Sequence, residues 1–311
     1  MSKILSVFGA TGGQGRSVVE AVLADGTLSA EFRIRGIARD VSKPVARELS
    51  ARGVEMVQAD MLSKDSVRYA LKGSHTVFLM TAPVVNQWDL EKTQGKNVAD
   101  VSEELGVEHL IFSSLLSVAE LSNGERPNVH PTEAKAEVER YIRAKNIPSS
   151  FVLTGVFMHN FILPPWQNFR KGDDGTLVWT IPGSSEAKIP LIDNEKDVGK
   201  YVVGMMKSTP EIFGKRVLAS VDYYTPTRII SEFQEITGKP VRLVQKADWD
   251  TFMKWLPPPV GPIMFEIESG FDGVGYYAGE SLEESLNILA KSGSPPTTWK
   301  DFVKENIAAF P

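Results

Sequence analysis

The stretch that decides the fold is Lys3–Glu20, which reads K-I-L-S-V-F-G-A-T-G-G-Q-G-R-S-V-V-E. Its apolar start predicts a buried strand over Ile4–Phe8, and the residues from Gly13 to Ala24 carry apolar side chains at helical spacing. A strand, a glycine-rich turn and a helix in this order are typical of a dinucleotide-binding site. Three glycines separate the two elements: Gly9, Gly12 and Gly15.

Each of these glycines has a mechanical purpose in such a turn. Gly9 permits a tight turn after the strand, Gly12 lets a pyrophosphate approach the backbone, and Gly15 lets the helix pack close to the sheet. The helix then presents free N–H groups to the phosphates. The alternative is a turn that holds no ligand, since the spacing is GxxGxxG rather than GxGxxG. We predict that the whole turn binds cofactor: Gly9, Ala10, Thr11, Gly12, Gly13, Gln14 and Gly15.

The remainder of the first half alternates short apolar runs with segments of helical period, which is typical of a parallel sheet covered on both faces. We therefore predict an α/β fold, a doubly wound parallel sheet of the Rossmann type. The expected strands are Ile4–Phe8, Phe32–Ala38, Val54–Gln58, Thr76–Met80, Val107–Phe112 and Ser150–Leu153. The expected helices are Gly13–Ala24, Lys43–Ala51, Ser63–Leu71, Asn86–Leu105 and Thr132–Lys145.

After about residue 154 the regular alternation of strands and helices ends, and residues typical of turns become frequent. We assign residues 1–153 to the nucleotide-binding domain and 154–311 to a smaller mixed α/β lobe, with possible return strands and helices to the main sheet. Pro257–Pro259 with Gly261 and Pro262 predicts an exposed or extended link. Helices are expected over Glu195–Met206, Thr227–Thr237, Ala247–Trp255, Ser281–Ala290 and Trp299–Asn306.

The residues after the second expected strand bear on which dinucleotide binds. An acidic residue there bonds a ribose hydroxyl, whereas an arginine accommodates a 2′-phosphate. Arg39 comes first and Lys43 follows, so we predict NADP as cofactor. Asp40 is the competing signal, which favours NAD, and both charges could instead be solvated surface groups.

Two further strand ends belong to the same predicted cleft. Asp60 and Met61 follow the third strand, where the carboxylate could meet the adenine amino group or cap the next helix. Thr81, Ala82 and Pro83 follow the fourth strand, where small residues would let the backbone run beside the cofactor.

Composition excludes several other functions. The chain has 34 basic and 39 acidic residues, no basic run and no cysteine, so direct nucleic-acid binding, disulfides and a thiolate metal site are not expected. The four histidines lack paired spacing, and we predict no metal. The strand pattern begins by Lys3 and no apolar run has the length of a membrane span, so we expect neither a signal peptide nor membrane insertion.

Together these motifs resemble the NmrA-like family of atypical short-chain dehydrogenase/reductases. The resemblance rests on G-A-T-G-G-Q-G at Gly9–Gly15, Arg39, and Q-G-K-N-V-A-D-V-S-E-E-L-G-V-E-H-L-I-F-S-S at Gln94–Ser114. It continues with K-A-E-V-E-R-Y-I at Lys135–Ile142 and G-V-F-M-H-N-F at Gly155–Phe161, and more faintly to Val241. It implies a Rossmann domain that binds NADP or NAD. The members include enzymes, among them the related isoflavone-reductase-like proteins, and redox-sensing regulators.

Carried over by position, the resemblance adds Lys135 and the stretch Phe157, Met158, His159 and Asn160 to the predicted cofactor site. Ordinary members of the wider group place a catalytic tyrosine four residues before this lysine. Here that position is Pro131, so the usual tyrosine mechanism is unavailable.

Lys135 is therefore the leading candidate for a general acid or base, although it could simply hold the nicotinamide ribose. His130 and His159 are alternatives for proton transfer, and surface roles are open for both. Ser113 and Ser114 could polarise a carbonyl or serve strand-end hydrogen bonding. Aromatic residues that could line a substrate pocket or pack in the core are Trp88, Phe157, Trp166 and Phe169.

Two functions from different classes follow. The first is an NADP-dependent oxidoreductase that acts on a small carbonyl, enone or aromatic substrate. The second is an NADP-sensing redox regulator that acts through a protein partner. We expect a cytoplasmic location, with the nucleus possible for a regulator.

Overall fold

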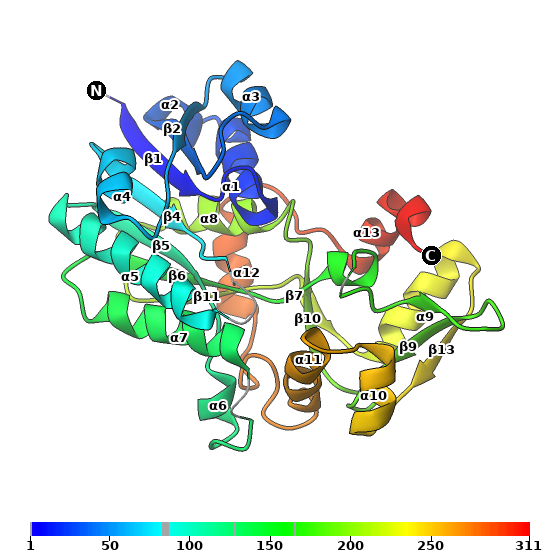
Figure 1. The fold of residues 1–311 in the computed structure, drawn as a ribbon. Coiled ribbons are helices and arrows are strands. Elements are labelled where there is room, and N and C mark those ends of the chain that lie inside the picture. Colours follow the sequence, from blue (N-terminus) through cyan, green and yellow to red (C-terminus); the bar gives the residue numbers. More distant parts are fainter. Residues whose placement is uncertain (1, 83–86, 127–128, 165) are drawn as a thin grey trace.

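The computed structural model describes residues 2–82, 87–126, 129–164 and 166–311. Its main feature is a seven-stranded parallel sheet with the order β11-β6-β5-β4-β1-β2-β3 (Figure 1). The strand order reverses between β1 and β4, and ligands of doubly wound sheets bind in the crevice at such a reversal. The strands are β1 (Lys3–Phe8), β2 (Phe32–Ala38), β3 (Glu55–Gln58), β4 (Thr76–Leu79), β5 (His109–Ser114), β6 (Ser149–Thr154) and β11 (Arg216–Ala219).

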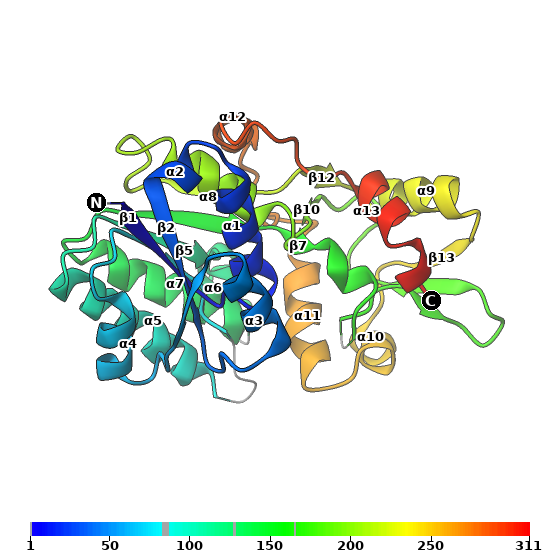
Figure 2. The same cartoon turned by 90° about the horizontal axis from the view of Figure 1, so that it is seen from above.

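Helices cover both faces of this sheet because its strands are apolar on both sides. In β4, Phe78 packs into one core while Val77 and Leu79 pack into the other. Figure 2 shows α8 and α12 on one side of the sheet and α4 and α5 on the other. The first core is covered by α1 (Gly13–Ala24), α8 (Val198–Met206) and α12 (Glu283–Ala290). The second is covered by α4 (Lys64–Leu71), α5 (Trp88–Glu104) and α7 (His130–Arg143).

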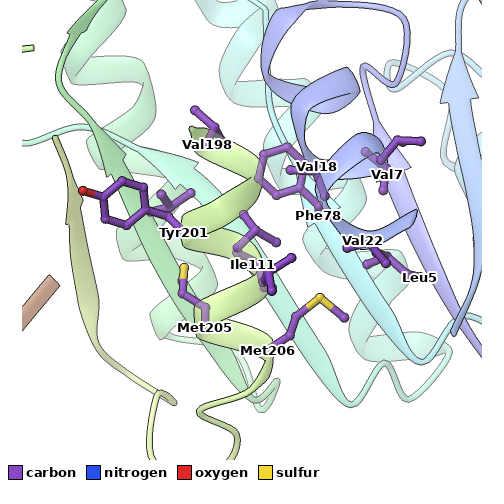
Figure 3. Packing of buried hydrophobic residues seen from close by; sticks show 14 of the residues in the cluster. Leu5, Val7, Val18, Val22, Phe78, Ile111, Val198, Tyr201, Met205 and Met206 are labelled. Carbon is purple, nitrogen blue, oxygen red and sulfur yellow. The ribbon is translucent and has the colours of Figure 1, made fainter. Parts of the chain in front are cut away.

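Helix α8 belongs to the main domain although it comes late in the chain. Its Val198 and Tyr201 lie in the same core as Val18 of α1 (Figure 3). A Cβ atom on Gly199 would lie 2.0 Å from the carbonyl oxygen of Ser17, so only glycine allows this approach of α8 to α1. Together with β11 and α12, α8 returns to the nucleotide-binding domain from the region after residue 154.

The smaller lobe lies beside the carboxyl-end side of the main sheet and has its own aromatic core (Figure 1). It contains two three-stranded sheets, β12-β10-β7 and β13-β9-β8. The strands are β7 (Val156–Phe157), β8 (Arg170–Lys171), β9 (Leu177–Thr180), β10 (Ile189–Ile192), β12 (Asp222–Tyr224) and β13 (Val241–Val244). Its helices are α9 (Pro226–Thr237), α10 (Trp249–Trp255), α11 (Val260–Ser269) and α13 (Trp299–Glu305). The core includes Phe161, Phe169, Trp179, Phe233, Trp299 and Phe302.

The expected α/β fold is confirmed, and the six expected strands and five expected helices of the first half are all present, with ends that differ by a few residues. The prediction of an exposed or extended link holds for Pro257–Pro259, which are exposed. It is wrong for Gly261 and Pro262, which lie in the first turn of α11. Proline is tolerated there because the first N–H groups of a helix have no intrahelical partner. The expected helix over Lys43–Ala51 is α3 (Pro44–Ala51), and short helices that were not predicted include α2 (Leu28–Glu31) and α6 (Val118–Leu121).

Within the described ranges, no helix combines the length and the apolar character that crossing a bilayer requires.

Candidate functional site

The glycine turn after β1 has the conformation that its sequence predicts. Gly9 has φ of +68°, and its carbonyl oxygen accepts a hydrogen bond of 2.9 Å from the Gly12 N–H. A Cβ atom on Gly15 would lie 2.2 Å from that same oxygen, so α1 starts directly against the turn. At Gly12 an added Cβ would meet only the Gly9 oxygen, at 3.5 Å. The turn is therefore closely packed at Gly15 and has room for a side chain, and so for a ligand, at Gly12.

The N-terminus of α1 has neither a capping side chain nor an acidic residue of its own. Gly12 is the N-cap and supplies no side chain, and the first turn contains no acidic residue. The partial positive charge of the helix end is thus uncompensated within α1. A hollow of about 450 Å³ lies over the turn, lined by Thr11, Gly12, Gly13, Arg16, Glu20, His159, Asp193, Glu195, Lys196, Glu305 and Asn306.

His159 stands over this glycine turn. Its Nδ1 atom lies 3.1 Å from Oδ1 of Asn194, and its ring meets Phe302 edge-on at 5.0 Å between centroids. Asn194 in turn lies beside Gly13, since an added Cβ there would be 2.7 Å from its Nδ2. His159 is thus held by the loop between β10 and α8, beside the predicted pyrophosphate position. Of the neighbouring predicted residues, Met158 is buried in the aromatic core of the smaller lobe, and Phe157 and Asn160 are half-buried.

Three charged side chains follow β2, and they differ in whether they form hydrogen bonds within the protein. Asp40 Oδ1 accepts hydrogen bonds from the hydroxyl of Ser42 at 2.6 Å and from its N–H at 2.9 Å. These bonds hold the pKa of Asp40 below its usual range. Arg39 and Lys43 are exposed, and neither side chain has a hydrogen bond or ion pair with any described residue. The carboxylate is turned back on its own chain, while the two cations are available to a ligand.

The loop after β3 is organised by its neighbours. Asp60 is exposed, and its Oδ1 accepts from the Leu62 N–H at 2.9 Å. The alternative that Asp60 caps the next helix is wrong: Ser63 is the N-cap of α4 and accepts from the N–H of Ser66. Asn97 on α5 donates to the carbonyl oxygen of Met61 at 2.9 Å and fixes the loop.

Thr81, after β4, lies at the centre of a buried polar network. The Nζ atom of Lys135 on α7 donates to the Thr81 carbonyl oxygen and to its hydroxyl oxygen, both at 3.1 Å. The Thr81 hydroxyl donates to Oε1 of Glu91 at 2.8 Å, and Lys135 reaches the same oxygen at 2.8 Å. Ala82 follows as a half-buried residue, and the predicted Pro83 lies outside the described residues.

The two serines at the end of β5 are engaged in structural bonds. Ser113 donates to Oε1 of Gln14 at 2.7 Å, which ties the start of α1 to β5. Ser114 donates to Oε2 of Glu139 at 2.6 Å. Both hydroxyl hydrogens are therefore engaged, and neither serine has one free to polarise a substrate carbonyl.

His130 lies at the first residue of α7, exposed to solvent, and stacks on Trp88 of α5 with 5.6 Å between ring centroids. The next residues, Pro131 and Thr132, face a different space. They help to line a mostly apolar cavity of about 110 Å³ between the main domain and the loop after α11. The structure therefore separates His130 from this cavity. Its other lining residues are Leu115, Leu116, Val118, Leu121, Arg126, Ile267, Gly270, Phe271, Val274, Gly275 and Tyr276.

Of the residues singled out as aromatic candidates, Phe169 is fully buried among other rings of the smaller lobe, so the packing role holds for it. Sequence reasoning missed Glu91. The signal was present, because Glu91 precedes Gly95, Val98 and Ser102 at the spacing of the buried face of α5. A carboxylate at an apolar position of a helix indicates a buried partner.

Comparison with known proteins agrees with this geometry. A sequence model described as the NmrA-like family matches residues 1–303. The chain belongs to the NmrA-like family. The NmrA-like family domain-containing oxidoreductase cpsB of Aspergillus campestris is 33% identical over 271 residues, which cover 82% of this chain and 78% of the relative.

Two solved structures of NmrA, described as a negative transcriptional regulator, share the fold. The complex with NADP has a TM-score of 0.78 and 23% sequence identity, and the alignment covers 98% of this chain and 95% of that one. The complex with NAD has a TM-score of 0.79 and 24% identity at the same coverage. The NmrA-like fold thus accommodates either nicotinamide dinucleotide in a protein similar to this one.

Proposed function

We propose that this NmrA-like protein is an oxidoreductase that uses NADPH and acts on a small carbonyl, enone or aromatic substrate. The observation that carries the cofactor choice is the end of β2. Neither Arg39 nor Lys43 has a side-chain hydrogen bond or ion pair with a described residue, whereas Asp40 accepts hydrogen bonds from Ser42. A free guanidinium suits a 2′-phosphate, while a carboxylate that bonds Ser42 is poorly placed for a ribose hydroxyl.

Different residues of the crevice would bind different parts of the cofactor. The open N-terminus of α1 and the turn from Gly9 to Gly15 would bind the pyrophosphate. Lys135, fixed at the end of β4, would bind the nicotinamide ribose. When bound, the nicotinamide supplies or accepts the hydride. The relative from Aspergillus campestris, which is named an oxidoreductase, supports this chemistry for the family.

The substrate would lie toward the apolar cavity beside Pro131 and Thr132. A proline at this point provides no proton, and Ser113 is bonded to Gln14. Proton transfer by a positioned side chain contributes about 10²–10⁴-fold to a typical rate, so hydride transfer without it is slowed but retained.

A second function, a regulator that senses NADP(H), is favoured by the same missing tyrosine. It is also supported by the description of NmrA as a transcriptional regulator that binds NADP or NAD. Such a protein would act through a protein partner, and cofactor could change that contact only through different affinities for two conformations. The enzyme would work in the cytoplasm, and the regulator could also act in the nucleus.

Two linked measurements test these proposals. Purified protein is titrated with NADPH and NADH by fluorescence, and the loss of NADPH absorbance is followed with quinones, enones and aldehydes. We expect tighter binding of NADPH and turnover with at least one acceptor class. Tight binding without turnover across the panel would favour the regulator. If neither nucleotide binds at millimolar concentration, both proposals are wrong.

A further inference from the structure

Glu91 is a fully buried carboxylate whose role none of the motifs above explains. It lies in the first turn of α5 and has no exposed surface. Its Oε1 atom accepts from Nζ of Lys135 and from the hydroxyl of Thr81, each at 2.8 Å. Its Oε2 atom is buried and has no hydrogen-bond partner in the described part of the chain. A charge in this position is costly unless it is paired, and Lys135 is its ion-pair partner here.

The ammonium of Lys135 is fixed by this arrangement. An ammonium has three N–H donors, and the structure provides three oxygens within 3.1 Å: Glu91 Oε1, the Thr81 hydroxyl and the Thr81 carbonyl. The side chain of Lys135 is only 12% exposed. A lysine side chain otherwise rotates freely about four bonds, so three contacts restrict it to one place at the end of β4.

This place is the crevice where the strand order reverses, next to β1 and its glycine turn. The same helix, α5, also bonds the loop after β3 through Asn97 and Met61. One helix therefore supports two of the strand-end loops that the proposed cofactor would contact.

We infer that Glu91 is a positioning residue for Lys135. Its carboxylate holds the ammonium at the end of β4. Lys135 would then bind the nicotinamide ribose by exchanging one of its two contacts with Thr81 for a ribose hydroxyl. The inference rests on the proposed function, since it assigns Glu91 to the same NADPH site. Glu91 itself would not touch the cofactor, because its side chain is buried behind Lys135 and Thr81.

The alternative is that Glu91 merely joins α5 to α7. The chain offers a matched control for that role, because Glu137 on α7 pairs with Lys96 at 2.6 Å and with Lys92 at 3.1 Å, both on α5. Glu137→Gln removes an ion pair between the same two helices without touching Lys135.

The test is a double-mutant cycle on NADPH affinity. The dissociation constant is measured by fluorescence for wild type, Glu91→Gln, Lys135→Met, the double variant and Glu137→Gln, with melting curves for each. We expect Glu91→Gln to weaken NADPH binding about 5- to 50-fold when Lys135 is present and less than about twofold when it is Met, as for directly coupled residues. Glu137→Gln should change the affinity less than about twofold, the range of an uncoupled site.

Additive effects in the cycle, or an equal loss for Glu137→Gln, would overturn the inference. Wild-type binding of NADPH is measured first, so an additive cycle refutes the role of Glu91 and leaves the cofactor proposal intact.

A second measurement covers the case in which Lys135→Met does not fold. Acetylation of Lys135 by a water-soluble acetylating reagent is compared by mass spectrometry with that of the exposed Lys43 in wild type, Glu91→Asp and Glu91→Gln. We expect Lys135 to be protected in wild type, intermediate in Glu91→Asp and most reactive in Glu91→Gln. Equal protection in all three proteins would show that Glu91 does not hold the lysine, and would refute the inference.

Discussion

Replacement of Arg39 by alanine is the sharpest test of whether the end of β2 distinguishes NADPH from NADH. Arg39 is exposed and has no partner among the described residues, so its loss should change the free energy of unfolding by no more than about 0.5 kcal/mol. If the NADPH proposal is correct, the substitution also removes a contact with the doubly charged 2′-phosphate. A hydrogen bond to a charged group contributes about 1.5–3 kcal/mol. Because about 1.4 kcal/mol corresponds to a factor of ten, NADPH affinity should fall about 10- to 150-fold.

The environment of Arg39 narrows this range. The side chain is in contact with solvent, and charges near a surface are screened over a Debye length of about 8 Å at physiological ionic strength. We therefore expect the lower end of the range at physiological salt and a larger loss in dilute buffer. NADH lacks the phosphate, so its affinity should change little.

The assay is a fluorescence titration with NADPH and NADH at two salt concentrations. The matched control is Arg33→Ala, because Arg33 is also an exposed arginine of β2 without a partner among the described residues. Arg33→Ala should leave both affinities nearly unchanged. An equal loss of NADPH and NADH affinity in Arg39→Ala, or the same loss in Arg33→Ala, would refute the assignment of the 2′-phosphate to this position.

Further predictions concern the glycine turn and a buried acid. Gly15→Ala should lower the free energy of unfolding by about 1–3 kcal/mol, the usual cost of overpacking, and weaken NADPH binding, since the new Cβ would lie 2.2 Å from the Gly9 oxygen. Gly26→Ala, where no atom lies within 4 Å, is the control in urea unfolding, and similar losses in both would contradict the packing argument. Burial raises the pKa of Glu268 to about 8 from its usual value of 4.5. As pH rises, the unfolded chain therefore loses this proton at a lower pH than the folded chain does. The free energy of unfolding should fall between about pH 4.5 and about pH 8. Glu268→Gln should therefore gain melting temperature relative to wild type at pH 8.5 more than at pH 5, and a constant difference would refute this.

The fold was readable from the sequence because its signals are local. A strand reveals itself by a short apolar run and a helix by its period, and both require only neighbouring residues. The prediction of a helix over Gly13–Ala24 is confirmed to the residue, because glycines mark its start and the apolar period continues to its end. The family followed from the same local motifs. The residues near Gly9 could be predicted to bind cofactor because they follow a strand directly.

The contacts that give the site its chemistry depend on residues far apart in the chain. Glu91 and Lys135 are 44 positions apart, and Gln14 and Ser113 are 99 apart. Nothing in either local segment shows that an acid on one helix will meet a lysine on another. The proposal that Arg39 rather than Asp40 contacts the cofactor also rests on the tertiary structure, which shows that Asp40 bonds Ser42.

The sequence by itself determined the strand–turn–helix unit, the alternation of elements and the family, because backbone preference and hydrophobic period act over a few residues. Only the tertiary structure decided that α8 returns to pack on α1 at Gly199, that Ser113 is bonded to Gln14, and that Lys135 is held by a buried carboxylate. The physical reason is that burial removes water as a partner. Each buried polar group then needs a hydrogen-bond partner within the protein, and the fold decides which segment supplies it.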